Sequence, residues 1–511
     1  MLKVGAPAPY RETHLAGAHT HICSILRRLA WVLGLVALAA CSRGGSSSQA
    51  RTLKLQPCQL EGLAPQAQCG TLEVFENRET KTGRKLSLRV AVVPALAAQP
   101  QPDPLVFLAG GPGQAATRLG AVLRAVEPIR RQRDIVLVDM RGTGDSSPLD
   151  CEFLPKDAGL ADYFSEDDDL APRIRACRER WDADVRQYTT PIAMADLDEV
   201  RAALGYEKLN LWGGSYGTRA ALVYMRQYPQ RVRTAILDGV APMGLYLPLY
   251  MPRDAQRSLD LLLAHCEKDA ACEKNFPRLR TRTEALLEKL SQEPARVRVA
   301  HPRTGVPEDI VLTRQAFVGA LFGLLYSAED SSMVPLMLDR VTQGDWAPFV
   351  ALNVGRGERM EKVMSRGLQM AVVCAEDVPF LDTAAVEREA KGTWFGAGMG
   401  LEMMKACEGW PKATLPEGFR EAVVSDVPTL LLSGELDPVT PPAWAEEAKR
   451  TLKNSLHVQV PGVGHNTLGV DCVRKLMVDL VADGRVDTLK PSCGAGLARP
   501  PFFTSFAGPV P

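Results

Sequence analysis

Ser215 lies in a short glycine-rich segment that could present a nucleophile. The segment reads Gly213-Gly-Ser-Tyr-Gly217, a G-x-S-x-G sequence that follows a predicted strand and precedes a predicted helix. A serine on such a sharp turn has strained backbone, and glycines at the flanking positions leave room where side chains would collide. The sequence therefore predicts an exposed nucleophilic hydroxyl at Ser215.

A nucleophilic serine needs a histidine to take its proton, and that histidine needs a carboxylate to orient it. His465 is the predicted base because it lies in a glycine-rich loop directly after the last predicted strand, at 456–460. The other histidines beyond residue 40 are weaker candidates, because they lie inside that strand or in a helix-rich region: His457, His265 and His301.

Asp437 is the predicted orienting acid. It leaves the preceding predicted strand in Ser433-Gly-Glu-Leu-Asp437, at the same sheet edge as the serine and the histidine. Glu435 in the same loop is the alternative. The chain order serine, aspartate, histidine is the order found in α/β-hydrolases.

Two backbone N–H groups are predicted to stabilise the negative charge that develops on a substrate oxygen. The N–H of Tyr216 opens the helix behind the nucleophile, where anions are favoured. The N–H of Gly111, within Gly110-Gly-Pro-Gly113 after another predicted strand, is the second donor. A rival interpretation takes Gly111 to Ala116 as a dinucleotide-binding fingerprint, with Asp139 as the ribose-binding acid. A proline inside the turn and a strand pair upstream are unusual for that fingerprint.

Short apolar runs occur where strands are needed to position these residues. They are typical of buried strands in a parallel sheet, and they alternate with helical stretches such as 196–204 and 219–228. This alternation predicts a doubly wound α/β structure, preceded by a hairpin at 71–76 and 85–94. The predicted buried strands are 105–108, 135–138, 209–212, 234–237, 429–432 and 456–460.

Residues 241–420 interrupt the alternation with segments of helical period, such as 257–267 and 280–290, and few strand-like runs. We interpret them as a mainly helical cap inserted between two halves of one sheet, 55–240 and 421–511. A separate helical domain is the alternative, and the return of strand signals after the insertion counts against it.

Composition and charge exclude several classes of protein. The 511 residues contain 60 Lys and Arg against 60 Asp and Glu, so the formal net charge is zero. Apolar residues are 46% and charged residues 23%, which excludes disordered, collagen-like and polytopic membrane proteins. A balanced charge gives no electrostatic basis for binding nucleic acid.

The N-terminus predicts export. Two arginines precede the apolar run 29–40, which is too short to span a bilayer, so residues 1–40 are predicted to be a signal peptide. The run ends in Leu38-Ala-Ala-Cys41, which resembles a bacterial lipoprotein box with Cys41 as the lipidated residue. A Gly/Ser-rich tether, 41–54, follows. Ser42 after the cysteine favours the outer membrane in a host that has one. A plain secretory signal is the alternative.

Ten further cysteines fit an oxidising compartment. None of them forms a C-x-x-C pair, so zinc-ribbon and thioredoxin motifs have no support. They occur as five neighbouring pairs, although ten cysteines allow too many pairings for the count to fix the connectivity. Ten free buried thiols are the alternative. The cysteines are Cys58 and Cys69, Cys151 and Cys177, Cys266 and Cys272, Cys374 and Cys407, and Cys472 and Cys493.

Several motifs together resemble the tripeptidyl and prolyl aminopeptidase family of α/β-hydrolases. They are Gly-Gly-Pro-Gly, Asp-Met-Arg-Gly-Thr-Gly-Asp-Ser-Ser from Asp139, Gly-Gly-Ser-Tyr-Gly-Thr, Gly-Glu-Leu-Asp-Pro-Val-Thr-Pro and Gly-Val-Gly-His. The resemblance covers most of residues 55–495 and favours the secreted tripeptidyl branch. It implies an α/β-hydrolase fold with Ser215 as nucleophile, His465 as general base and Asp437 as its orienting acid. The sequence has Ala109 before the glycines where many relatives have histidine.

The resemblance implies an exported serine aminopeptidase that acts on peptides. An esterase or amidase of a small metabolite and a non-catalytic binding lipoprotein are the alternatives. A peptide's free amino end needs a carboxylate, because a buried cation is costly without one. Glu376, next to Asp377 and close to Cys374, is the predicted partner. No metal or cofactor motif is present, so none is expected, and the oligomeric state is not predicted.

Overall fold

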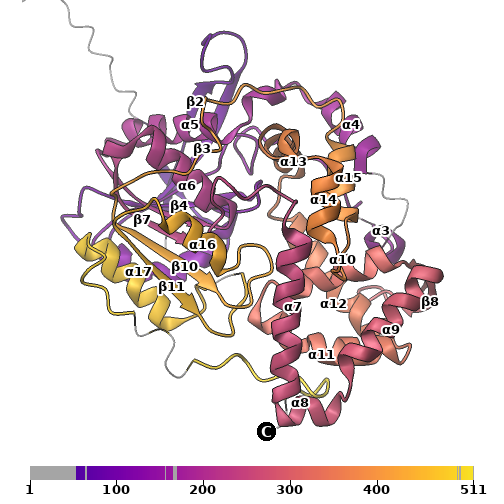
Figure 1. Cartoon of the computed structure of the whole chain (residues 1–511). Helices are drawn as coiled ribbons and strands as arrows, with labels where there is room; N and C mark the ends of the chain where they lie inside the picture. Colours follow the sequence, from indigo (N-terminus) through magenta and orange to yellow (C-terminus); the bar gives the residue numbers. More distant parts are fainter. Residues whose placement is uncertain are drawn as a thin grey trace, which may run out of the picture. The chain divides into compact units, whose positions relative to one another are not determined.

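The computed structural model describes residues 53–509 except 64–65, 156, 165–169, 466, 492 and 494–496. The predicted signal peptide, the predicted lipidation site Cys41 and nearly all of the predicted tether lie outside the described residues. Figure 1 shows the described chain as a sheet with helices packed against it and a group of helices beside it.

The central sheet has nine strands in the order β1-β2-β3-β5-β4-β6-β7-β10-β11. The strands from β5 to β11 in this order run parallel, whereas β1, β2 and β3 pair antiparallel, as does β3 with β5. The bounds are β1 (Gln56–Cys58), β2 (Ala67–Phe75), β3 (Lys85–Val93), β4 (Leu105–Leu108), β5 (Ile135–Val138), β6 (Leu209–Gly214), β7 (Val232–Asp238), β10 (Thr429–Gly434) and β11 (Ser455–Val460).

Helices cover both faces of the parallel strands, which explains why β4, β5 and β10 are buried at every position. One face packs against α5 (Thr190–Ala203), α6 (Tyr216–Gln227) and α16 (Pro442–Lys449). The other packs against η1 (Ala116–Val126), α2 (Glu127–Arg130) and α17 (Asp471–Asp483). By contrast, β2 alternates buried and exposed residues because it lies beyond the covering helices.

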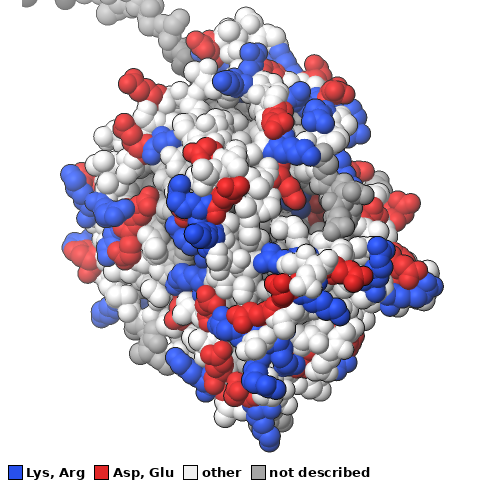
Figure 2. Space-filling model, turned by 45° about the vertical axis from the view of Figure 1, so that its right-hand side comes forward, with Lys and Arg blue, Asp and Glu red and all other residues white. Residues whose placement is uncertain are grey.

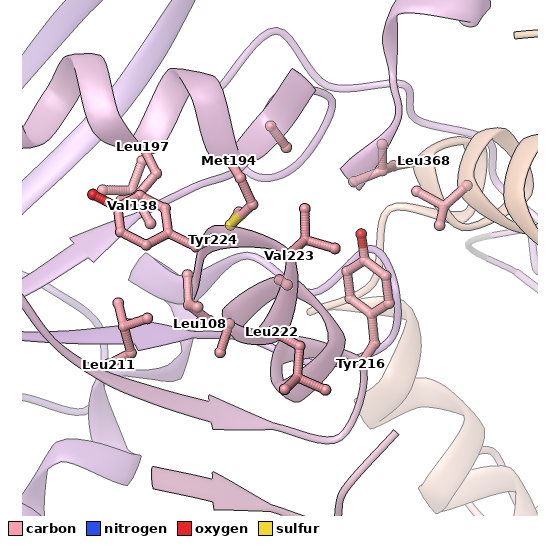
Figure 3. Close-up of a cluster of buried hydrophobic side chains, with 14 of the residues drawn as sticks. Leu108, Val138, Met194, Leu197, Leu211, Tyr216, Leu222, Val223, Tyr224 and Leu368 are labelled. Carbon is pink, nitrogen blue, oxygen red and sulfur yellow. The ribbon is translucent and has the colours of Figure 1, made fainter. Parts of the chain in front are cut away.

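The hydrophobic cluster on the face covered by α5, α6 and α16 holds α6, the helix that follows Ser215, against the sheet. Figure 3 shows Leu108 and Leu211 of the sheet close to Met194 of α5 and Tyr224 of α6, with Tyr216 at the start of α6. Ten of the twelve residues of α6 are buried. Burial of this kind is worth about 1.5–3 kcal/mol for each large apolar side chain, so α6 is held firmly on the sheet.

The region 241–420 contains a second set of helices with a hydrophobic cluster of its own. Their bounds are α7 (Met251–Lys268), α8 (Ala270–Asn275), α9 (Leu279–Gln292), α10 (Arg314–Leu324), α11 (Ala328–Thr342), α12 (Ala347–Glu361), α13 (Arg366–Glu376), η4 (Val378–Phe380), α14 (Thr383–Ala390) and α15 (Gly398–Ala406). We call these helices the cap. Earlier in the chain lie α3 (Leu160–Phe164), α4 (Leu170–Arg180), η2 (Val185–Gln187) and η3 (Pro229–Arg231).

Packing in the cap departs from the predicted boundaries in two places. Leu368 and Cys374 of α13 pack in the cluster of the sheet, not in that of the cap. Conversely, Leu160 and Phe164 of α3 pack with the cap. The cap also holds a two-stranded sheet, β8 (Ala295–Ala300) with β9 (Pro307–Leu312), which the sequence did not predict. The polar residues that alternate along β8 and β9 hide the short apolar signal.

All ten described cysteines form disulfides, and each pairs with its neighbour in sequence. Their Cα–Cα separations lie between 5.2 and 5.8 Å, within the range of native disulfides. The pairs are Cys58–Cys69, Cys151–Cys177, Cys266–Cys272, Cys374–Cys407 and Cys472–Cys493. The longest closed loop, between Cys374 and Cys407, ties α13 to the end of α15.

Basic and acidic side chains are interspersed over the face of the molecule in Figure 2, in keeping with the zero formal charge. Within the described ranges, no helix combines the length and the apolar character that crossing a membrane requires.

Candidate active site

Ser215 lies on a strained turn between β6 and α6. Its backbone φ is 55° and ψ −125°, a region that side-chain-bearing residues rarely adopt. A Cβ at Gly217 would overlap the carbonyl of Leu108, and one at Gly213 would overlap the carbonyl of Gly217. The Ser215 N–H donates to the Asp238 carbonyl at 2.8 Å, which ties the turn to β7. The two glycines therefore leave the space that lets the hydroxyl project from the turn.

Ser215, His465 and Asp437 form a continuous chain of hydrogen bonds. Ser215 Oγ lies 2.8 Å from His465 Nε2, and His465 Nδ1 lies 2.9 Å from Asp437 Oδ2. Each residue follows a parallel strand: β6, β11 and β10 respectively. The structure brings together the three residues that the sequence singled out, at the carboxyl edge of the sheet.

Asp437 is fully buried and its carboxylate accepts several hydrogen bonds besides that of the histidine. The N–H groups of Val439 and Thr440 donate to Oδ1 at 2.8 Å, and the Thr440 hydroxyl donates to Oδ2 at 2.8 Å. Burial alone would raise the pKa of Asp437, but the charge and hydrogen bond of His465, together with these donors, hold that pKa below its ordinary value. Burial lowers the pKa of His465, and Asp437 outweighs it, so the net shift is upward.

Two backbone N–H groups near Ser215 have no hydrogen-bond acceptor among the described residues. The N–H of Tyr216 belongs to the first turn of α6, where no intrahelical acceptor exists. Gly111 has a φ of 109°, which a side chain would disfavour. The neighbouring Gly110 N–H donates to Gln114 Oε1 at 3.1 Å, whereas the N–H of Gly111 stays free.

The cap holds the loop that carries Gly111. The link between α12 and α13 pairs with it: the Ser365 N–H donates to the Gly113 carbonyl at 2.8 Å, and the Ala115 N–H donates to the Val363 carbonyl at 3.3 Å. A Cβ at Gly113 would collide with the Ser365 carbonyl, so the close approach depends on glycine.

The carboxylate of Asp139, which a dinucleotide fingerprint would offer to a ribose, is already bonded. It is fully buried, and it accepts from the Thr117 N–H at 2.9 Å, the Thr117 hydroxyl at 2.7 Å and the Asp145 N–H at 3.2 Å. Asp139 braces a loop, and the dinucleotide interpretation has no support in this geometry.

The alternative polar residues have structural partners of their own. Glu435, the other candidate acid, accepts from the Gly462 N–H at 2.8 Å. His457 lies 2.9 Å from the Ser433 hydroxyl and 2.5 Å from Glu446 Oε1, a second serine–histidine–acid arrangement. Ser433, however, lies inside β10 and is completely buried, so no substrate could reach it.

A cavity of about 550 Å³ opens over Ser215 and His465. Its floor comes from the sheet edge, including Gly111 and Tyr216, and its walls come from cap residues of α7, α10, α12 and α13 and the loops that follow α10 and α12. This volume is typical of sites that enclose a drug-sized ligand. No group of three or more His, Cys, Asp or Glu side chains suited to a metal ion occurs in the part of the chain that the structure describes.

Glu376 is not in the wall of this cavity. Its side chain is completely buried at the end of α13, where it accepts from the Thr190 N–H at 2.5 Å and the Thr190 hydroxyl at 2.8 Å. The adjacent Asp377 pairs with Arg219 at 3.0 Å and with Arg420 at 2.8 Å. The prediction that Glu376 meets a substrate's amino end is therefore wrong for this structure, because its oxygens face α5.

Two cavity residues were missed by sequence reasoning. Asp238 ends β7 beside the triad, and its Oδ1 accepts from the Thr467 hydroxyl at 2.8 Å; burial raises its pKa to about 6. Its place directly after a predicted strand was the signal. Tyr326 lies between α10 and α11, and the centre of its ring is 5.3 Å from that of the His465 ring. The backbone N–H of His465 donates to the Tyr326 carbonyl at 2.7 Å. No sequence pattern marked that residue.

Comparison with known proteins agrees with this architecture. Residues 103–301 match the model of the α/β-hydrolase fold family, and residues 392–493 match that of the TAP-like proteins. Serine protease Hip1 of Mycobacterium tuberculosis is 25% identical over 452 residues, which cover 82% of this chain and 85% of Hip1. Tripeptidyl aminopeptidase of Streptomyces coelicolor is 30% identical over 219 residues, 39% of this chain and 40% of that protein.

Among solved structures, proline iminopeptidase of Mycobacterium smegmatis covers 81% of this chain and 98% of its own, with 15% identity and a TM-score of 0.40. A TM-score of 0.40 is too low to add to the fold assignment, which rests on the family-model matches and on the strand order. The chain has the α/β-hydrolase fold and is a serine hydrolase, similar to proteins named as serine peptidases.

Proposed function

We propose that this protein is a serine peptidase that releases short N-terminal peptides, or single residues, from peptide substrates. The observation that carries the proposal is the hydrogen-bonded chain Ser215–His465–Asp437, whose serine and histidine line a cavity next to the free N–H groups of Gly111 and Tyr216. The names of the relatives, a serine protease and a tripeptidyl aminopeptidase, support a peptide as the substrate.

The chemistry proceeds through an acyl-enzyme. Ser215 Oγ attacks the scissile carbonyl carbon while His465 Nε2 takes the hydroxyl proton, and the N–H groups of Gly111 and Tyr216 donate to the resulting oxyanion. His465 then gives the proton to the leaving amine, and the C–N bond breaks. Water then attacks the acyl carbon while His465 Nε2 takes its proton, the bond between Ser215 Oγ and the acyl carbon breaks, and the histidine returns the proton to Ser215 Oγ. Asp437 keeps the imidazole oriented and stabilises its cationic form.

The test compares peptide p-nitroanilides that have a free amino end with the same peptides after N-acetylation. An aminopeptidase hydrolyses the free peptides and loses at least about tenfold in kcat/KM on the acetylated ones, which corresponds to about 1.4 kcal/mol. Equal rates on both would contradict the proposal. Ser433→Ala is a matched control for Ser215→Ala, because it removes a serine hydroxyl bonded to histidine but buried away from the cavity.

A second candidate is an esterase or amidase of a small metabolite. One observation favours it: Asp238 is the one carboxylate among the described residues of the cavity wall, and it is bonded to Thr467. Among the described residues of the cavity wall, no acid without a hydrogen bond is therefore placed to receive a substrate's ammonium group. Faster turnover of short esters than of any free-amino peptide would decide for this candidate.

We also propose that the protein is exported and anchored to the bacterial cell envelope by lipid on Cys41, with the outer membrane favoured in a host that has one. The apolar run 29–40, the Leu-Ala-Ala-Cys box and Ser42 support this. Several acyl chains would be needed, because one chain binds membranes only marginally. Cys41→Ala should move the protein from the membrane fraction to the soluble fraction with its specific activity unchanged. A Cys41→Ala protein that stays in membranes would overturn lipid anchoring.

A further inference from the structure

The cavity wall is richer in cations than in acids. Its described residues include Arg219, Arg356 and Arg366. Arg219 is neutralised by Asp377 at 3.0 Å, and Arg366 by Glu361 at 3.0 Å. The Arg356 guanidinium makes no ion pair or hydrogen bond with any residue of the described ranges. One guanidinium of the cavity therefore remains without a counter-charge.

Arg356 is held in a defined place. It projects from α12, and its Cζ lies 5.2 Å from the centre of the Tyr326 ring in a cation–π contact. The Tyr326 ring in turn contacts the ring of His465 at 5.3 Å. The guanidinium also packs against Gly323 of α10, where a Cβ would overlap it. The cation is therefore one aromatic ring away from the imidazole of the triad.

The surroundings do not supply an anion for this cation. Asp238 is bonded to Thr467, and Asp330, which lies close enough to influence Arg356, makes no hydrogen bond or ion pair with it. Burial lowers the pKa of Arg356, and the nearby Arg359 and Arg366 act in the same direction. Holding a partly buried cation without a partner is costly, and a bound carboxylate would remove that cost.

We propose that Arg356 binds a carboxylate of the substrate and makes the site selective for anionic substrates. The inference rests on the proposed function only in that the substrate occupies this cavity. A guanidinium suits the role, because its fork of N–H donors matches a carboxylate. The two ring contacts, of 5.2 and 5.3 Å, place the guanidinium at most about 10.5 Å from the imidazole, roughly three extended residues. The carboxylate therefore belongs to a group within about that reach of the scissile bond.

Two parts of a peptide could supply this carboxylate: an acidic side chain or the C-terminus. The test measures kcat/KM for a series of peptides of three to five residues that differ at one place only. One arm replaces a glutamate by glutamine at each position in turn, and the other replaces the C-terminal acid by the amide. The wild-type protein should prefer the anionic member of at least one pair by about tenfold or more, since hydrogen bonds to charged groups have this strength.

The decisive variants are Arg356→Gln and Arg356→Lys. Arg356→Gln should lower kcat/KM on the preferred anionic peptide at least tenfold more than on its neutral partner, and Arg356→Lys should restore part of the preference. Arg359→Gln, an exposed arginine of the same helix, is the matched control and should leave the preference intact. Gly323→Ala should also weaken the preference, because the added methyl group displaces the guanidinium without removing its charge.

The inference fails if the Arg356→Gln protein discriminates as the wild type does, or if the wild type cleaves the peptides with no preference in either arm. The mono-p-nitrophenyl ester of suberic acid against p-nitrophenyl octanoate separates this failure from that of the proposed function. A protein that cleaves no peptide but prefers the anionic ester through Arg356 would refute the peptidase and retain the anion site. A protein that cleaves anionic and neutral peptides equally well would support the peptidase and refute the anion site.

Discussion

At the residue scale, the ionisation of the histidine controls the reaction. His465 must be neutral to accept the serine proton, so kcat/KM should rise with pH through the pKa of His465. Asp437 shifts that pKa upward from about 6.5, and the acid limb should therefore lie above that value. A rate that is flat between pH 5 and 8 would contradict a histidine base.

Replacing Asp437 tests the effect of its charge on the pKa of His465. Asp437→Asn removes that charge, so the acid limb of the pH profile of kcat/KM should move to lower pH. The amide can also present an N–H to His465 Nδ1 and so favour the wrong tautomer of the imidazole. We expect a loss of roughly 10⁴-fold in kcat, as for other triads. Asp238→Asn is the comparison variant: its charge also raises the pKa of His465, but it makes no direct hydrogen bond to the ring, so its shift should be smaller.

The residues of the triad were predictable because each stands directly after an apolar strand, and parallel strands deliver such residues to one edge. Ser215, Asp437 and His465 all satisfy that rule. Arg356 and Tyr326 do not, since they reach the cavity from a cap helix and from a link between two cap helices, whose placement depends on packing between distant segments. Glu376 shows the same difficulty: its position in the chain was compatible with the cavity, and the rotation of α13 buries it instead.

At the element scale, the turn between β6 and α6 depends on the absence of side chains. A Cβ at Gly217 would overlap the carbonyl of Leu108, so β4 and α6 would have to separate. Gly217→Ala should reduce the free energy of unfolding by about 1–3 kcal/mol, a typical cost of overpacking, and should remove activity because Ser215 moves with the turn. Urea unfolding measures the first effect.

Gly469→Ala provides the control for that variant, because Gly469 is exposed and a Cβ there would meet nothing within 4 Å. Its stability should match the wild type. If the Gly217→Ala protein were as stable and as active as the Gly469→Ala protein, the close approach of α6 to β4 would not hold in solution.

Elements with a strong period were predicted well. The run at 105–108 is β4, and the helical pattern at 280–290 lies within α9 (Leu279–Gln292). The hairpin β8–β9 escaped prediction because charged residues alternate with its few apolar ones, and α7 begins at Met251, earlier than the pattern from 257 predicted. Pro252 at the start of α7 is tolerated there because the first helical N–H groups have no intrahelical acceptor.

At the scale of the whole molecule, the hydrophobic clusters of the sheet and of the cap meet around one cavity. The sheet and its helices carry the triad, and the cap supplies Tyr326 and Arg356 and holds the loop of Gly111 through Ser365. The sequence predicted that a helical insertion would lie between two halves of a sheet. It could not show which side chains of the insertion face the triad, because amphipathic patterns locate the buried side of a helix but not its neighbour.

The most direct test of Ser215 as the nucleophile is covalent labelling of the full chain with a fluorophosphonate, followed by mass spectrometry of its peptides. We predict one adduct, on Ser215, and we expect it to be absent from Ser215→Ala and retained in Ser433→Ala. Hydrolysis should fall by roughly 10⁶-fold in Ser215→Ala and stay unchanged in Ser433→Ala. An adduct on another residue, or a Ser215→Ala protein that still hydrolyses substrate at the wild-type rate, would contradict the assignment of Ser215 as the nucleophile.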